Sequence, residues 1–64
     1  MVNRVRPLRK ARGFSQITLA EKSDVARAIV MRVDANPHAK IPLDTAVKLA
    51  GALGVRPEDL LATA

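Results

Sequence analysis

The sequence predicts an all-α fold, a compact five-helix domain, and two features carry this prediction. Residues 43–53 have small and apolar side chains at helical spacing, and Gly54 follows them as a residue type that often ends helices. Two shorter helical stretches, 16–23 and 26–34, flank a tight turn at Asp24. No alternating strand pattern, repeat or low-complexity segment competes, so we expect helices alone.

The first helix is expected over residues 4–12 and should end at Gly13, which accepts a left-handed backbone. Pro7 complicates its start. If Asn3 caps the helix, Pro7 is the fourth helical residue and removes a backbone hydrogen bond; otherwise the helix starts late, near Arg6. The sequence leaves both starts open.

The next two helices have clearer boundaries. Ser15 is expected to cap the second helix, 16–23, although Thr18 stands where a capping box would have glutamate. Asp24 occupies the turn, and aspartate tolerates a positive φ better than most residues. The third helix should end before Asn36-Pro37.

The last two helices complete the core. The stripe expected to face inward from the fourth helix is Leu43, Ala46, Val47, Leu49, Ala50 and Leu53. A final helical turn should begin at Pro57, with Glu58 and Asp59 near its positive end.

Composition excludes several classes of function. The chain has 64 residues, which suits a single domain spanning 1–64, and it has no cysteine, one histidine (His38) and one aromatic residue (Phe14). These counts argue against disulfides, metal sites, an enzyme's nucleophile–base pair and stacking platforms for single strands or RNA. We expect no metal, cofactor or small-molecule substrate. With no apolar run long enough for a membrane span or signal segment, we expect a cytoplasmic protein.

Positive charge is concentrated near the N-terminus. The formal net charge is +5, and many of the 11 basic residues precede the first acidic residue, Glu21. These early basic residues are Arg4, Arg6, Arg9, Lys10 and Arg12. A basic half favours a polyanionic partner, most simply nucleic acid, although a solvated basic face is an equally weighted alternative.

The paired helices around Asp24 have the sequence form of a helix-turn-helix, and nearly the whole chain resembles one family that carries it. The segments that carry the resemblance are LRKARGFSQ (8–16), LAEKS (19–23), LDTA (43–46), LAGALGV (49–55) and Leu60-Leu61. In this order and spacing they resemble the phage repressor and Cro type of DNA-binding domain, the XRE family.

The resemblance implies five helices around one core and sequence-specific binding to a double-stranded DNA operator, usually as a homodimer. The third helix, about 26–34, would lie in the major groove. Carried over by position, Arg27, Ala28 and Arg32 would face base edges, and Gln16 would contact a phosphate. Arg9 and Asp34 match a partly buried ion pair between the first and third helices of relatives.

Physical arguments extend this set of candidate contacts. Arginine is suited to bidentate contact with guanine, so we expect at least one guanine in each half-site. Non-specific phosphate contacts are expected from Arg4, Arg6, Lys10, Arg12 and Lys40.

The run Ile29-Val30-Met31 departs from the family pattern, because relatives usually have polar residues at positions 29 and 31. Three consecutive apolar residues also cannot all face the core of one helix. Three interpretations of Ile29 stay open, in this order: contact with a thymine methyl group, packing in the core, and binding of a protein partner.

The sequence thus predicts a transcriptional regulator, most simply a repressor, that associates with the nucleoid when bound to DNA. The alternative is a protein-interaction module that keeps the fold but has weak or no base readout. A dimer contact could come from Val55 and residues 60–62, whose simpler role is to close the core.

Overall fold

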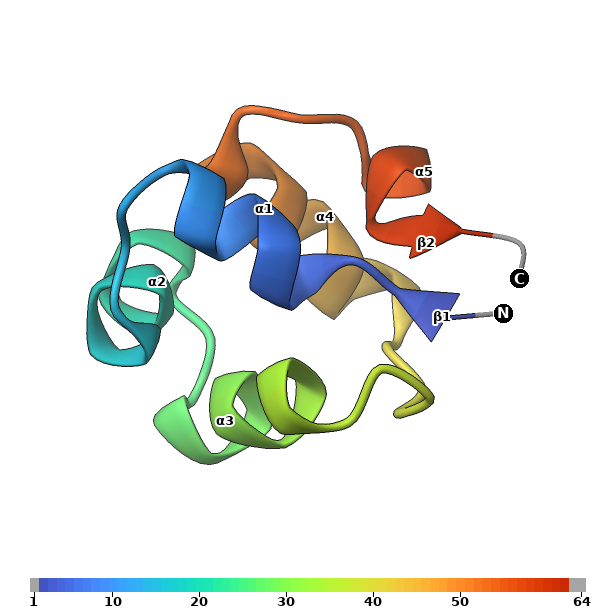
Figure 1. The fold of residues 1–64 in the computed structure, drawn as a ribbon, viewed down its shortest axis with the longest axis horizontal. Coiled ribbons are helices and arrows are strands. Elements are labelled where there is room, and N and C mark those ends of the chain that lie inside the picture. The colour runs from blue at the N-terminus through green and yellow to red at the C-terminus, as the bar shows by residue number, and fades with distance from the viewer. Residues whose placement is uncertain (1, 63–64) are drawn as a thin grey trace.

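The computed structural model describes residues 2–62, which form five helices and one short strand pair (Figure 1). In chain order the elements are β1 (Val2–Asn3), α1 (Val5–Ala11), α2 (Gln16–Ser23), α3 (Arg27–Ala35), α4 (Leu43–Leu53), α5 (Pro57–Leu60) and β2 (Leu61–Ala62). The all-α class and the order of the helices are confirmed. Within residues 2–62, no helix is long and apolar enough to cross a membrane.

The expectation of helices alone is wrong at the two ends of the described chain. β1 pairs antiparallel with β2, with Val2 opposite Ala62 and Asn3 opposite Leu61. Two-residue strands are too short to produce an alternating pattern, so periodicity cannot reveal them. The pairing brings the first and last described elements together (Figure 1).

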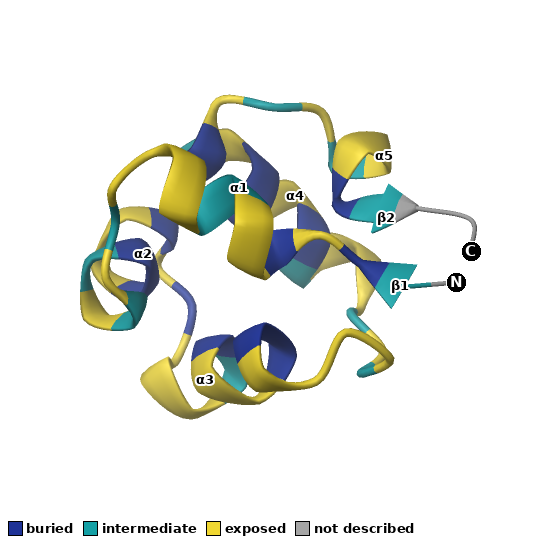
Figure 2. Ribbon diagram, viewed as in Figure 1, coloured by how far each residue is buried: buried dark blue, intermediate teal, exposed yellow. Residues whose placement is uncertain are grey.

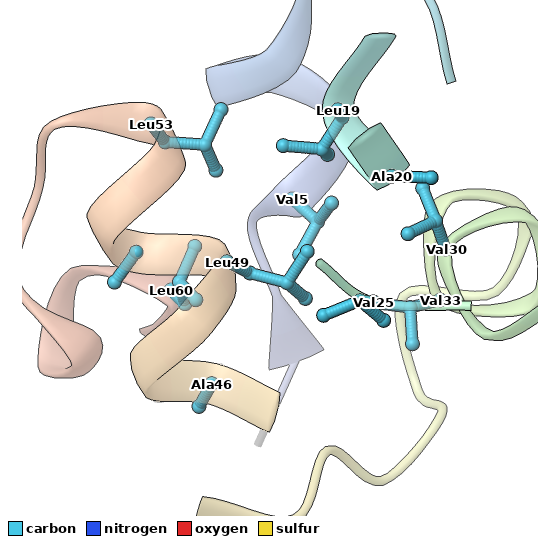
Figure 3. Close-up of a cluster of buried hydrophobic side chains, with 11 residues drawn as sticks. Val5, Leu19, Ala20, Val25, Val30, Val33, Ala46, Leu49, Leu53 and Leu60 are labelled. Atoms are coloured by element: carbon cyan, nitrogen blue, oxygen red, sulfur yellow. The ribbon is translucent and has the colours of Figure 1, made fainter. Parts of the chain in front are cut away.

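One apolar core lies between the helices. Figure 2 shows the buried positions on the inner sides of the helices, and Figure 3 shows their side chains converging. The buried apolar residues are Val5, Leu19, Ala20, Val25, Val30, Val33, Ala46, Leu49, Ala50, Leu53 and Leu60. Burial of this apolar surface is the main driving force for folding the helices together.

The expected inward stripe of α4 is wrong at two positions. Leu43 and Val47 are 74% and 52% exposed, whereas the other four residues of the stripe are buried. Residues 46, 49, 50 and 53 already form the face that packs on the core. Leu43 and Val47 lie beside that face. Helical spacing alone therefore predicted an apolar stripe wider than the face that is buried.

The start of α1 lies between the two expected positions. Arg4 is the N-cap, Val5 is the first helical residue and Pro7 is the third. The first backbone hydrogen bond of the helix runs from Leu8 N to the Arg4 carbonyl over 3.2 Å. Pro7 therefore precedes every residue that donates within the helix and costs no bond.

Asn3 has a different role from a plain cap. Its Oδ1 accepts a hydrogen bond from the Val5 amide (3.3 Å), while its Nδ2 donates to the Asn36 carbonyl (3.0 Å). The Asn3 amide also donates to the Pro37 carbonyl over 2.7 Å. Asn3 thus ties the start of α1 to the loop that follows α3.

The N-cap of α2 and the turn between α2 and α3 both form as expected. Ser15 Oγ accepts from the Thr18 amide (3.0 Å) and donates to the Thr18 hydroxyl (2.9 Å), so Thr18 completes a local network. Asp24 is the only described residue other than glycine with a positive φ, 59°. The buried Ser23 hydroxyl donates to the Leu19 carbonyl over 2.6 Å.

Candidate nucleic-acid interface

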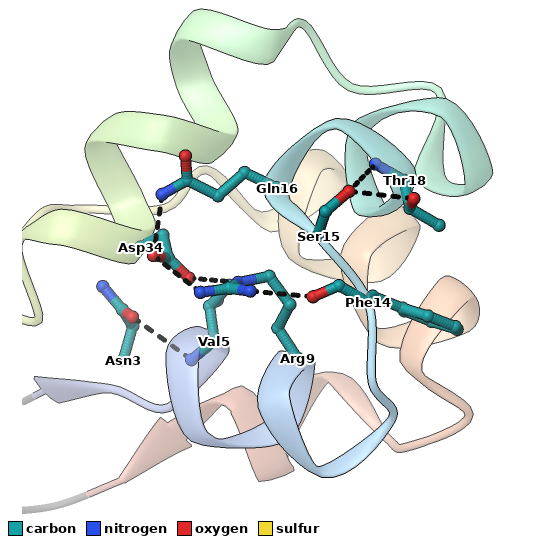
Figure 4. Close-up of polar contacts among 8 residues, drawn as sticks. All are labelled: Asn3, Val5, Arg9, Phe14, Ser15, Gln16, Thr18 and Asp34. Atoms are coloured by element: carbon teal, nitrogen blue, oxygen red, sulfur yellow. Dashed lines mark hydrogen bonds and ion pairs between the residues drawn. The ribbon is translucent and has the colours of Figure 1, made fainter.

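A polar network at the junction of α1, α2 and α3 fixes how these helices meet (Figure 4). Arg9 Nε donates to Asp34 Oδ1 (2.7 Å), and Arg9 Nη2 donates to Asp34 Oδ2 (3.2 Å). Gln16 Nε2 donates to Asp34 Oδ2 (2.9 Å), and Arg9 Nη1 donates to the Phe14 carbonyl (2.7 Å). The side chains of Arg9 and Asp34 are only 12% and 3% exposed.

The network keeps Asp34 ionised. Burial alone raises the pKa of a carboxyl group, and this is the largest single influence on Asp34. Hydrogen bonds from Arg9 and Gln16, together with the positive charges of Arg9 and Arg6, outweigh burial and lower the pKa below its ordinary value. A charged Asp34 at the end of α3 is therefore part of the folded structure.

The outward face of α3 is the surface expected to meet DNA. Val30, Val33 and Asp34 are buried against the rest of the protein. The exposed residues recur at helical spacing and form the α3 outer face: Arg27, Ala28, Met31, Arg32 and Ala35. Three of the four residues expected to contact bases, Arg27, Ala28 and Arg32, thus lie on one exposed face.

Ile29 faces partly inward and Met31 faces solvent, whereas Ile29 was the residue expected to contact a base. Ile29 is half-buried and packs against the core, in line with its second interpretation, although part of the side chain stays accessible. Met31 is 52% exposed and lies four residues after Arg27 on the α3 outer face. Sequence reasoning did not place Met31 among the base contacts, although its spacing from Arg27 indicates the shared face.

The expected phosphate contacts occupy several sites. Gln16 is the first residue of α2, and its side chain binds Asp34. Arg4, Arg6, Lys10 and Lys40 are exposed. Arg6 belongs to α1, and its positive charge helps to lower the pKa of Asp34.

Arg12 lies elsewhere. A Cβ added to Gly54 would come within 2.8 Å of the Arg12 guanidinium, so this side chain covers the C-terminal end of α4. That end of α4 lies across the molecule from α3 (Figure 1). The negative end of the helix dipole favours a cation there.

Residues 2–62 contain no group of three or more histidine, aspartate and glutamate side chains that could hold a metal ion. Two helices joined by a left-handed residue, with a basic second helix facing solvent, define a helix-turn-helix protein of the DNA-binding class. Residues 4–64 match the family of Cro/C1-type helix-turn-helix DNA-binding domains. The chain belongs to this family, and it is a DNA-binding domain of the transcriptional-regulator type.

Solved structures of regulators have the same fold. The restriction-modification controller protein C.AhdI from Aeromonas hydrophila is 40% identical, with a TM-score of 0.80 over 91% of this chain and 86% of that chain. SinR, the master regulator for biofilm formation, was solved in complex with DNA. It is 29% identical, with a TM-score of 0.84 over 92% of this chain and 94% of that chain.

A separate structure, the N-terminal DNA-binding domain of SinR from Bacillus subtilis, is 28% identical, with a TM-score of 0.82 over 94% of this chain and 87% of that chain. A comparison with curated proteins found no match.

Proposed function

We propose that the protein binds a specific double-stranded DNA operator as a homodimer, with α3 in the major groove, and acts as a repressor. The observation that carries this proposal is the α3 outer face, which presents Arg27 and Arg32 to solvent. The opposite side of α3 is fixed by Val30 and Val33 in the core and by the ion pair of Asp34 with Arg9. A rigidly held helix can present its side chains to bases at low entropic cost.

Base edges are contacted, in this proposal, by Arg27, Ala28 and Arg32, with Met31 between them. At least one arginine binds guanine O6 and N7 through two hydrogen bonds. Ala28 and Met31 supply the apolar surface that suits thymine methyl groups, and the accessible part of Ile29 borders it.

Phosphates are contacted by the backbone amide of Gln16 at the positive end of α2, while its side chain stays bound to Asp34. Arg4, Arg6, Lys10 and Lys40 add attraction that falls with salt. Arg12 contributes less to this attraction because its guanidinium covers the end of α4.

An NMR titration of the labelled protein with a duplex tests this arrangement. Amide signals should shift most in α3 and around Gln16, and little at the C-terminal end of α4. Shifts centred on α4 or α5 would contradict the proposal. Because the titration detects weak complexes, it does not require that the operator sequence be known.

A second candidate is a protein-interaction module with weak base readout, which the half-exposed Met31 favours. The two candidates differ in their response to Arg27→Ala. A DNA-binding regulator loses its sequence preference, whereas an interaction module has no preference to lose.

A further inference from the structure

Met31 is the only sulfur-bearing side chain among residues 2–62. The chain has no cysteine and two methionines, and the other methionine, Met1, lies outside the described residues. The chain also has no tryptophan and no tyrosine. The thioether of methionine reacts with hydroperoxides to form a sulfoxide. Within the described chain, Met31 is therefore the side chain that such an oxidant modifies most readily.

The position of Met31 makes its thioether accessible in the free protein. Met31 lies at the centre of α3 and is 52% exposed. Arg27 and Ala35 lie one helical turn before and after it on the α3 outer face, and Arg32 follows it directly. The sulfur atom therefore belongs to the middle of the surface that is proposed to meet DNA.

The core does not depend on Met31. The residues that hold α3 against the rest of the protein are Val30, Val33 and Asp34, which are buried. Because about half of the Met31 side chain is already in water, an oxygen added to its sulfur leaves no polar atom stranded in the core. Oxidation at this position should alter the recognition surface and leave the fold intact.

The reaction is a two-electron oxidation of the sulfur. A sulfur lone pair attacks one oxygen of the hydroperoxide, so an S–O bond forms as the O–O bond breaks, and the proton passes to the leaving oxygen. The sulfur becomes a sulfoxide, and the hydroperoxide becomes an alcohol, or water in the case of hydrogen peroxide. Sulfoxide reductases reverse the step with two thiols, which yields the thioether, a disulfide and water.

A sulfoxide changes what α3 can contact. The thioether is apolar and suits the methyl group of thymine, whereas the sulfoxide oxygen is polar. Against a methyl group, that oxygen would lose its water without gaining a hydrogen-bond partner. The guanidinium groups of Arg27 and Arg32, on the same face, can also donate to this oxygen instead of to guanine. Both effects weaken the complex with DNA, and neither requires a change of fold.

We propose that Met31 is a modification site at which a hydroperoxide lowers the affinity of the protein for its operator, and at which a sulfoxide reductase restores that affinity. The inference rests on the proposed function, because it requires that α3 meet DNA. It also predicts the reciprocal effect: a bound duplex covers the thioether and slows its oxidation.

Treatment of the full chain with hydrogen peroxide, followed by titration with the duplex selected from a randomised pool, tests the inference. Mass spectrometry of the peptide that contains Met31 measures the gain of one oxygen. The oxidised wild type should bind the duplex about tenfold more weakly, which corresponds to the loss of one base contact. Incubation with a thiol and the two sulfoxide reductases, one for each epimer, should restore the affinity.

Met31→Leu is the matched variant, because leucine has a similar apolar volume and cannot form a sulfoxide. Each protein is compared with itself before and after peroxide, so the starting affinity of the variant does not matter. The variant keeps Met1, and an effect of oxidation at Met1 would therefore appear in it as well. Peroxide should leave the affinity of Met31→Leu unchanged. Circular dichroism and thermal unfolding of the wild type should be the same before and after oxidation.

A second measurement compares the rate at which Met31 is oxidised in the free protein and in the complex with the duplex. The rate should fall in proportion to the fraction of protein that is bound. Equal rates in the two samples would overturn the inference, because the thioether would then lie outside the interface.

The inference alone is overturned if the wild type, with Met31 shown to be oxidised, binds the preferred duplex as before. It is also overturned if Met31→Leu loses as much affinity on treatment as the wild type, or if oxidation unfolds the protein. If the untreated wild type prefers no duplex over another, the proposed function fails first and the inference fails with it.

Discussion

Arg9 and Asp34, 25 positions apart in the sequence, form a two-bonded ion pair that fastens α1 to α3. Gln16 joins the same carboxylate from the start of α2. One buried charge thus sets the relative positions of the three helices that carry the candidate DNA contacts (Figure 4).

Removing one partner of this pair should destabilise the fold strongly. Arg9→Ala leaves the Asp34 carboxylate without its cation in a site where its side chain is 3% exposed. We expect a loss of about 3 kcal/mol in the free energy of unfolding, measured in urea. Gln16→Ala should cost only about 1 kcal/mol, because the ion pair remains. Equal losses for both variants would contradict this ranking.

The lowered pKa of Asp34 predicts acid sensitivity. Its carboxylate stabilises the folded state fully above the unfolded-state pKa, about 3.9, and this contribution is lost as the pH falls through the lower folded-state pKa. Urea unfolding between about pH 2 and pH 6 should show this loss in the wild type. Asp34→Asn should be less stable at neutral pH and should lose less on acidification; an unchanged slope would contradict the assignment.

Base readout by α3 predicts a distinct phenotype for its arginines. Arg27→Ala or Arg32→Ala should cost about 1–3 kcal/mol in binding to the preferred duplex, with relaxed discrimination at one base pair. Binding to unrelated duplexes should weaken much less. Titrations of both duplexes by fluorescence anisotropy measure the difference, and a uniform loss on both would assign these arginines to phosphates instead.

Phosphate contacts should appear in the salt dependence of binding. Arg6→Ala and Lys40→Ala should each reduce the slope of log affinity against log salt by about 0.9. Arg12→Ala is the matched control, since its guanidinium lies against Gly54. If Arg12→Ala reduced the slope of log affinity against log salt as much as Arg6→Ala does, the position of a basic residue would not matter for phosphate attraction, and the assignment of contacts would be contradicted.

Substitution by alanine should change the stability of the fold in opposite directions at Gly51, inside α4, and at Gly54, its C-cap. Gly54 has φ +72°, and its Cβ would meet the Arg12 guanidinium at 2.8 Å, so Gly54→Ala should destabilise by about 1 kcal/mol. Gly51→Ala enters open space within a helix and should stabilise by up to about 1 kcal/mol. Thermal unfolding of dilute protein compares them, and a shared sign would contradict the account.

The helices could be predicted because their signals are local. Ser15 caps α2, Asp24 makes the turn and Gly54 ends α4, each through its own backbone preference. α3 began and ended one residue later than expected, since Ala26 offers no side-chain cap to mark its start.

Features that depend on distant partners were not predictable from such signals. The β1–β2 pair joins residues 2 and 62, and the bonds of Asn3 reach Asn36. The bond from Gln16 to Asp34 and the position of Arg12 over Gly54 likewise require the packed helices. The ion pair of Arg9 with Asp34 could be predicted only from the family resemblance. The positions of charged residues along the sequence do not show which residues on separate helices will pair.

Selection of bound duplexes from a randomised pool near physiological salt tests the central claim most directly. The account predicts enrichment of a palindrome with half-sites about one helical turn apart, with guanine at a position that loses its preference in Arg27→Ala or Arg32→Ala. A pool that remains random, with binding that collapses as salt rises, would contradict sequence-specific recognition by α3.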